Sequence, residues 1–376
     1  MPLQPIRTEA DYDATIARIA RLMGAELGTA ASDELEYLIS LAGHYESEHS
    51  SMDEPVPEII QSIAAESGWT MGTEMPASSR QATTWRLRTR TLELGSRTLI
   101  MGVVNITPDS FSDGGHFLSP EAAIAHALQL IDEGADLLDL GAESTRPGSR
   151  AGSAEAAVSA DQEQSRLLPV LEGILHVRPN AILSVDTYKP ATAQVALASG
   201  AEIVNDVSGF AWDPSLVSVC AEFNAGVVLS HTRGRPEEWS TQPQLPPDAL
   251  MATVRDGLAA SLGFATAAGI PPHAIVLDPG YGFGKRFGEN YALLARQSEL
   301  LSLGRPLLAG LSRKSFLGRT LAPLHNGDDA PPAARENASL AALTAAILNG
   351  ASIVRVHSVR PAVEAARIAD AILAAS

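Results

Sequence analysis

LIMGVVNITPDSFSDGGHF, residues 99–117, is the stretch that decides the fold of this 376-residue chain. It begins with an apolar run that contains one Gly, and the run ends at Asn105 in a loop of Thr, Pro, Asp, Ser and Gly. A continuous apolar run of this length is typical of a strand buried on both faces, as in a parallel sheet. A polar residue at the end of such a strand lies where α/β enzymes place their chemistry.

The same pattern of a buried strand, a polar strand end and a helix recurs to the end of the chain. The predicted strands cover residues 99–105, 136–140, 181–185, 202–204, 226–229, 274–277, 306–309 and 352–354. The helices that follow them are predicted over 120–134, 153–175, 190–198, from 213, and over 247–268, 289–301, 335–348 and 361–374. Eight such units predict a (β/α)8 TIM barrel. The alternative is an open doubly wound sheet, which usually has a Gly-rich first turn that ITPDSFSDGG does not match.

A different composition precedes the barrel pattern. Residues 1–80 contain four Arg and no Lys against fourteen Asp or Glu, so they carry −10 of the total net charge of −17. Residues 1–67 are predicted to form a small acidic helical extension, with helices over 8–24, 33–49 and 58–67. Residues 68–84 have no periodicity and are predicted as a linker, and 85–376 form the barrel domain. Residues 85–94 are expected to form a hairpin that closes the floor of the barrel.

Composition excludes several classes of function. The acidic balance argues against a nucleic-acid or anionic-membrane surface, which needs a basic face. No run approaches the roughly 20 apolar residues of a membrane span, and the N-terminus lacks the regions of a signal peptide. The single cysteine, Cys220, excludes an intramolecular disulfide and a Cys-based metal cluster. The sequence therefore predicts a cytoplasmic protein.

Polar groups gather at the predicted strand ends, which meet at one face of a barrel. An Asp after a strand is as often a turn former, and a single His is more often structural than functional. Capping does not explain two basic side chains and a His at the same end, so the set predicts a ligand pocket. The polar groups after seven strands are Asn105, Asp186, Asn205, His231, Asp278, Lys314, and Arg355 with His357. After the second strand, the polar groups are in the loop and are Glu143, Thr145 and Arg146.

The chemistry of these groups divides them in two. Arg355, His357, Asn105 and the loop amides of residues 145–149 are donors that suit an anion such as diphosphate. The Asn105 carbonyl oxygen also suits Mg²⁺, which takes oxygen ligands and keeps substrate phosphates in its shell. The other four residues combine donors and acceptors that suit the edge of a flat heterocycle; they are Asp186, Asn205, Asp278 and Lys314. No Ser/His/Asp or Cys/His pairing is evident in the motif spacing.

Seven motifs, in order, resemble the motif series of the dihydropteroate synthase family. They are MGVVNITPDSFSDGG, DLGAESTRPGS, SVDTYKP, IVNDVSG, LDPGYGFGK, GLSRKSFLG and VRVH, and they cover the chain from about Arg97 onward. Enzymes of this family use Mg²⁺ to join 6-hydroxymethyl-7,8-dihydropterin diphosphate to 4-aminobenzoate. The reaction forms dihydropteroate and releases diphosphate. The resemblance also implies a homodimer and a dissociative reaction, in which diphosphate leaves before the arylamine attacks.

Residues at positions that match the family's motifs are expected to have the same roles in this chain. The pterin-binding residues implied are Asp186, Asn205, Asp278 and Lys314. Arg355 is expected to stack on the pterin and to bind the diphosphate with His357 and Asn105, the last also as the Mg²⁺ ligand. The aminobenzoate side is implied to consist of Thr145, Arg146, Pro147, Phe283, Ser312 and Lys314. The loops that hold Asp109, Phe111, Asp113 and residues 145–148 are expected to close over the site. The catalytic set is Asp113, which would stabilise the pterin cation, with Lys314, Arg355 and His357.

Three positions depart from the family pattern. Ser230-His231-Thr232 replaces the usual Met-His-Met, Ser358 stands where Asp is frequent, and Gly141-Ala142 replaces Gly-Gly. None of these changes removes a charged group assigned above.

Two alternative functions compete with that of an active synthase. A pterin-binding methyltransferase barrel would not require TPDSFSDGG or STRPG, and a non-catalytic paralogue would be expected to lose Lys314, Arg355 or His357. All of these are present. The front segment (PIRTEADYDATIARIARLMGAELGT and DELEYLISLAGHYESEH) resembles the leader of antitoxin-type helix-turn-helix regulators. Since no DNA-binding domain follows, that likeness implies at most a docking role.

Overall fold

The computed structural model describes residues 8–22, 29, 31, 34, 38, 42, 82–107, 119–144, 149, 151–153 and 157–375. The chain divides into two units, residues 1–74 and 75–376. In the first unit, α1 (Glu9–Leu22) confirms the first predicted helix. Thr8 and Asp11 cap it reciprocally, because each backbone N–H donates to the other's side chain, at 3.1 and 3.2 Å. The helices predicted over 33–49 and 58–67, and residues 68–81 of the linker, lie wholly or mostly outside the described residues.

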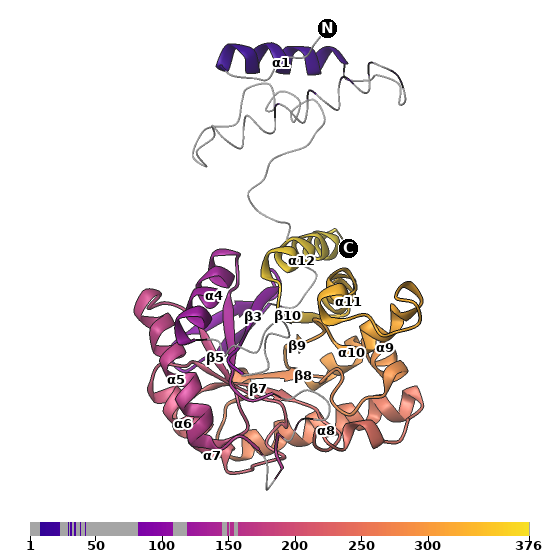
Figure 1. The fold of residues 1–376 in the computed structure, drawn as a ribbon. Coiled ribbons are helices and arrows are strands. Elements are labelled where there is room, and N and C mark those ends of the chain that lie inside the picture. The colour runs from indigo at the N-terminus through magenta and orange to yellow at the C-terminus, as the bar shows by residue number, and fades with distance from the viewer. Residues whose placement is uncertain are drawn as a thin grey trace. The chain divides into compact units, whose positions relative to one another are not determined.

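Eight parallel strands close into a barrel, with the helices arranged around it (Figure 1). The strand order is β10-β3-β4-β5-β6-β7-β8-β9, so each strand pairs with the next in sequence and the last pairs with the first. This topology confirms the predicted TIM barrel, and the predicted bounds agree to within one or two residues. The strands are β3 (Leu99–Asn105), β4 (Leu137–Gly141), β5 (Leu183–Asp186), β6 (Ile203–Asp206), β7 (Gly226–Ser230), β8 (Ile275–Asp278), β9 (Leu307–Ala309) and β10 (Ala351–Val356).

Helices follow the strands in the predicted alternation. They are α4 (Pro120–Asp132), α5 (Ala160–Val177), α6 (Pro190–Ala198), α7 (Leu216–Glu222), α8 (Pro247–Ala267), α9 (Phe287–Ala295), α10 (Ser315–Thr320), α11 (Glu336–Leu348) and α12 (Val359–Ala374). Short 3₁₀ turns cover Trp239–Thr241, Pro272–Ala274, Gln297–Leu303, Ala322–Leu324 and Pro332–Arg335. No helix in the described part of the chain is long and apolar enough to cross a membrane.

Two helical predictions need correction. The helix expected from residue 153 begins at Ala160, because Ser159 and Gln162 form a capping box that fixes the start of α5 there. The helix expected over 289–301 is instead α9 followed by a 3₁₀ segment. The short helix α10 was not predicted.

A hairpin closes the amino end of the barrel, as expected. Strands β1 (Thr83–Arg86) and β2 (Thr91–Leu94) pair antiparallel, so the barrel unit includes the last two residues of the predicted linker. Trp85 is fully buried, and its Nε1–H donates to the carbonyl of Ala274 at 3.0 Å. Residues of the hairpin share one apolar cluster with interior residues of the barrel strands; the cluster includes Trp85, Leu87, Leu94, Met101, Val228 and Leu308. With the floor filled by apolar side chains, the carboxyl ends of the strands are left to carry polar groups.

Candidate active site

Strand register brings three predicted site residues to one level of the rim. Asn105 of β3 pairs with Gly141 of β4, Gly141 pairs with Asp186 of β5, and Asp186 pairs with Asn205 of β6. Gly141 separates Asn105 from Asp186, and a side chain there would begin 3.7 Å from the Asp186 carboxylate. The residues that the sequence placed at separate strand ends are therefore neighbours.

Asp139 of β4 is the centre of a buried polar network. Its Oδ2 accepts hydrogen bonds from Arg355 Nε at 2.6 Å and from Asn205 Nδ2 at 2.9 Å. Arg355 Nη2 donates to Asp186 Oδ2 at 2.8 Å. Side chains from β4, β5, β6 and β10 are thus joined across the barrel mouth. Asp139 itself has no exposed surface, and it is a site residue that sequence reasoning missed.

Burial and neighbouring charges set the ionisation of this network. Burial raises the pKa of Asp186 to about 7, although the Arg355 cation opposes the shift. Burial alone would lower the pKa of Arg355, but Asp139 and Asp186 outweigh it and raise that pKa. Arg355 is therefore a cation here, and the Asp186 carboxyl ionises less readily than a free one.

Asp278 and Lys314 lie on the neighbouring part of the rim. Asp278 ends β8, and its Oδ1 accepts the Gly280 N–H at 2.7 Å. A side chain on Gly310, after β9, would begin 3.8 Å from Asp278 Oδ2 and 4.0 Å from Arg355 Cβ. The missing side chain at Gly310 therefore leaves space between these two groups. Burial lowers the pKa of Lys314 to about 8, against the attraction of Asp278.

An aromatic wall adjoins Lys314. Its ammonium lies 4.0 Å from the centroid of the Phe283 ring, a cation–π contact. Phe283 stacks on Trp239 with centroids 4.9 Å apart and an interplanar angle of 28°. The indole N–H of Trp239 donates to Thr232 Oγ1 at 3.1 Å, so the Thr that departs from the family pattern supports this wall. Trp239 was not predicted.

Ser312 and His357 meet across the ends of β9 and β10. Ser312 Oγ lies 3.0 Å from His357 Nδ1 and accepts the backbone N–H of His357 at 3.3 Å. The next residue, Arg313, has a left-handed φ of 58° and donates from Nη2 to Ser358 Oγ at 3.0 Å. Ser358, the second departure from the family pattern, thereby holds the turn that follows β9.

His231 does not join this polar group, which corrects the expectation of a polar residue from β7. Its ring packs against α8, where a Cβ on Gly257 would come within 2.6 Å of Cδ2. Burial lowers the pKa of His231 to about 2, and Nδ1 is buried without a hydrogen-bond partner among the described residues. The carbonyl of His231 accepts a hydrogen bond from the buried Lys285 ammonium at 2.6 Å. His231 is therefore a neutral packing residue.

The remaining predicted residues are only partly placed. Asn105 is half-buried, and its side chain makes no hydrogen bond to another described residue. Asp109, Phe111, Asp113, Thr145, Arg146, Pro147 and Gly148 lie outside the described residues.

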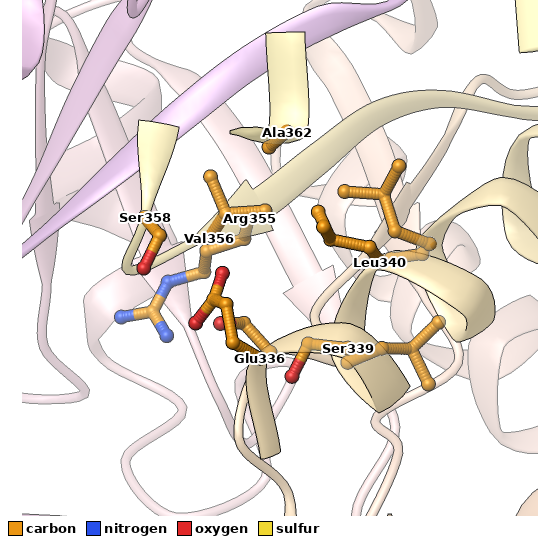
Figure 2. A pocket seen from close by; sticks show the side chains of 11 residues that line it. Glu336, Ser339, Leu340, Arg355, Val356, Ser358 and Ala362 are labelled. Atoms are coloured by element: carbon orange, nitrogen blue, oxygen red, sulfur yellow. The ribbon is translucent and has the colours of Figure 1, made fainter. Parts of the chain in front are cut away.

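A small cavity lies behind Arg355, between β10 and helices α11 and α12 (Figure 2). Glu336, Ser339 and Leu340 line one side, and Val356 and Ala362 line another. Its volume of about 10 Å³ is at the lower limit for one water molecule, so it is a packing gap beside the site and not a substrate pocket.

Known proteins match this barrel over nearly its whole length. The family model described as pterin binding enzyme matches residues 101–357. The dihydropteroate synthase of Bacillus subtilis is 41% identical over 282 residues, which are 75% of this chain and 91% of that protein. The chain belongs to the dihydropteroate synthase family. The dihydropteroate synthase of Escherichia coli is 39% identical over 73% of this chain and 92% of that protein.

Solved structures of this family agree with the fold. The Yersinia pestis dihydropteroate synthase, in complex with a sulfonamide drug, has a TM-score of 0.69 and 38% identity over 77% of this chain and 99% of that one. The Xanthomonas albilineans dihydropteroate synthase, in complex with 7,8-dihydropteroate, has a TM-score of 0.65 and 37% identity over 77% of this chain and 98% of that one. Membership of this family makes the chain a transferase of folate synthesis.

Proposed function

We propose that this chain is an active dihydropteroate synthase, which condenses 6-hydroxymethyl-7,8-dihydropterin diphosphate with 4-aminobenzoate to 7,8-dihydropteroate and diphosphate. The observation that carries the proposal is the network in which Asp139 holds Arg355 and Asn205 beside Asp186. The chain's position among dihydropteroate synthases at about 40% identity supports the same reaction. Neither alternative function is favoured by any feature of the site.

The pterin is assigned to the buried part of the rim. A pterin edge presents both N–H donors and ring acceptors. The carboxylates of Asp186 and Asp278 can accept from its donors, and Asn205 and Lys314 can donate to its acceptors. Buried polar groups reject a ligand that leaves them unpaired, so this set supports selection of one heterocycle.

The reaction is a substitution at the methylene carbon of the pterin. The C–O bond to diphosphate breaks first, and its electron pair leaves with the diphosphate. The arylamine nitrogen then attacks the resulting cation, forms the C–N bond and releases its proton to solvent. Arg355 has Nη1 without a hydrogen bond to another described residue, so it can bind the leaving diphosphate while Nε and Nη2 stay anchored. His357 is assigned to the same anion, and Asp113 to stabilisation of the cation.

Mg²⁺ is proposed to be held at Asn105. No group of three or more His, Cys, Asp or Glu in the described ranges could hold a metal. A half-buried amide at the rim with no partner among those residues fits a cation whose other ligands are phosphate and water oxygens. When bound, Mg²⁺ would supply charge neutralisation for the leaving diphosphate.

The 4-aminobenzoate is assigned to the side of the site that holds the aromatic wall. Phe283 and Lys314 offer a ring face and an ammonium 4.0 Å apart, which suits an aromatic carboxylate. Ser312 lies on the turn that leads to Lys314. Thr145, Arg146 and Pro147 are proposed to complete this side.

The deciding assay mixes purified protein, Mg²⁺, the pterin diphosphate and labelled 4-aminobenzoate. We expect labelled dihydropteroate to form, its formation to stop on addition of EDTA and to resume with excess Mg²⁺. Absence of product at micromolar enzyme would exclude the proposed activity. If product still forms in the presence of EDTA, only the role of Mg²⁺ is excluded. The pterin alcohol without diphosphate is the matched control, because it lacks the leaving group.

Two further proposals concern the setting of the enzyme. The proposal of a homodimer rests on the resemblance to the family. Sedimentation velocity of the full chain tests it, since a single monomer boundary at micromolar concentration would exclude a dimer.

The proposal of a cytoplasmic location rests on the single cysteine, which is buried as a free thiol, and fractionation of the source cells tests it.

A further inference from the structure

A second buried ionic network lies next to the candidate site. Lys189 Nζ lies 2.5 Å from Glu143 Oε2 and 3.1 Å from Glu163 Oε2. The side chains of the three residues are 13%, 6% and 2% exposed, respectively. Thr192 Oγ1 donates to Glu163 at 2.7 Å. Lys189 thus joins Glu143, in the segment after β4, to helix α5 and to the start of α6.

Glu143 also ties together the two ends of the connection between β4 and α5. Its Oε1 accepts the backbone N–H of Val158 at 2.9 Å. Glu143 lies two residues after β4, and Val158 lies two residues before α5. One carboxylate therefore closes this connection at its base, and Lys189 holds that carboxylate.

Tyr188 holds the same connection at a third point. Its hydroxyl accepts the backbone N–H of Gly152 at 2.8 Å. Trp212 packs edge-on against the Tyr188 ring with centroids 5.2 Å apart. Gly152 has φ +75°, and a Cβ there would come within 2.9 Å of Trp212 Cε3. Only glycine fits this position without moving the indole ring.

Stability alone does not account for this arrangement. Desolvation offsets much of the attraction within a buried ion pair, and apolar residues of similar volume often stabilise a fold as well or better. What the charged network provides is one defined geometry. Two consecutive residues, Tyr188 and Lys189, impose it on Glu143, Gly152 and Val158, which all belong to the connection that includes the aminobenzoate residues assigned above.

We propose that Tyr188 and Lys189 are positioning residues for the connection between β4 and α5, and that they set the affinity for the second substrate. The proposal rests on the proposed function for its consequence in substrate affinity, but not for the anchoring itself. Neither side chain forms a hydrogen bond to the pterin network around Asp139, so binding of the pterin diphosphate is expected to change much less than binding of 4-aminobenzoate.

The test compares Lys189→Met, Lys189→Arg and Tyr188→Phe with wild type. Lys189→Met removes the charge that pairs two buried carboxylates, and it is expected to raise KM for 4-aminobenzoate about tenfold while KM for the pterin diphosphate stays within about twofold. Lys189→Arg keeps the charge and should recover most of the affinity. Tyr188→Phe loses one hydrogen bond and should raise the same KM about threefold. Glu202→Gln is the matched control, since Glu202 is a buried carboxylate at the floor that accepts from the Thr89 N–H at 2.8 Å.

Amide hydrogen exchange of residues 143–158 measures the anchoring without relying on catalysis. We expect faster exchange there in Lys189→Met and Tyr188→Phe, and unchanged exchange in Glu202→Gln. Unchanged exchange, or equal increases in KM for both substrates, would overturn the proposal. If the wild-type enzyme makes no dihydropteroate, the proposed function fails while the exchange result still decides the anchoring. If Lys189→Met does not fold, Tyr188→Phe decides, because it leaves the ion pairs intact.

Discussion

Replacing Asp139 by Asn tests whether one buried carboxylate organises the site. In the folded protein Asp139 has no exposed surface and accepts two hydrogen bonds, from Arg355 Nε and Asn205 Nδ2. Asp139→Asn keeps the shape of the side chain but removes its charge and one of its acceptor oxygens. Arg355 keeps only Asp186 as an ionic partner, and the bonds from Arg355 and Asn205 now end on a neutral amide oxygen, which accepts them more weakly than a carboxylate does.

The expected cost follows from the charge lost. A hydrogen bond to a charged group contributes about 1.5–3 kcal/mol, and removing one partner of a buried ion pair costs about 3–5 kcal/mol. Arg355 keeps Asp186 and is 21% exposed, so we take the lower end, a loss of about 3 kcal/mol in the free energy of unfolding. Misplacement of Arg355 and Asn205 together is expected to lower kcat/KM for the pterin diphosphate about 100-fold, which equals about 2.7 kcal/mol.

Urea unfolding and steady-state kinetics measure the two losses separately. Asp370→Asn is the matched control, because Asp370 is 3% exposed and accepts two bonds from Thr98, at 2.8 and 2.7 Å, ahead of β3 at the other end of the barrel. The control should lose about 2 kcal/mol of stability with kcat/KM within about threefold of wild type. If Asp139→Asn behaves in the same way as this control, Asp139 is only a structural residue and our reading of the network is wrong.

Four other predictions follow from the same structure. Lys314→Ala and Asp186→Asn should each lower activity at least ~10²-fold, since each removes a charged hydrogen-bond partner; near-normal rates would contradict the pterin assignment. Burial lowers the pKa of His231 from about 6.5 to about 2, so only the unfolded chain takes up this proton as the pH falls below 6.5, and the contribution of His231 to the free energy of unfolding should fall by up to about 1.4 kcal/mol per pH unit. His231→Asn should remove this contribution from the pH dependence of urea unfolding between pH 5 and 6.5, and identical profiles would refute this. Removal of residues 1–80 should leave a folded, active barrel, because β1 begins at Thr83. An insoluble or inactive product would show that residues 1–80 are required. Calorimetry should show at least tenfold weaker binding of the pterin diphosphate without Mg²⁺, and unchanged binding of a pterin without diphosphate.

The barrel could be predicted because its signals are local. Each strand is a short apolar run ended by a polar residue, and caps such as Ser119 mark helix starts within one turn. Errors arose where a tertiary contact or a stronger local signal decided the bounds. The helix was predicted to start at Ser153, for example, but the Ser159 capping box sets the start of α5 at Ala160.

The candidate site was only partly predictable, because its members are defined by the direction in which buried side chains face. Asp139 lies within LLDLG, whose five residues are all buried, so no alternation in the sequence indicates that this carboxylate faces the barrel interior. His231 shows the opposite error, since its position after a strand is that of a ligand but its ring packs against Gly257 of α8. Trp239 contributes through a stack with Phe283, 44 residues later, which no local pattern indicates.

The charges in the pterin network give a physical reason to expect a cation in the proposed reaction. Three carboxylates, Asp139, Asp186 and Asp278, lie with two basic groups, Arg355 and Lys314. Such a set is close to balanced, and it suits the uncharged pterin ring. A diphosphate that enters beside it brings several negative charges next to carboxylates in a region of low dielectric, where like charges repel strongly. Arg355 cannot compensate them alone, because Asp139 and Asp186 already share its charge. We therefore propose that a divalent cation bound at the amide of Asn105, at the same level of the rim as Asp186, would restore the balance.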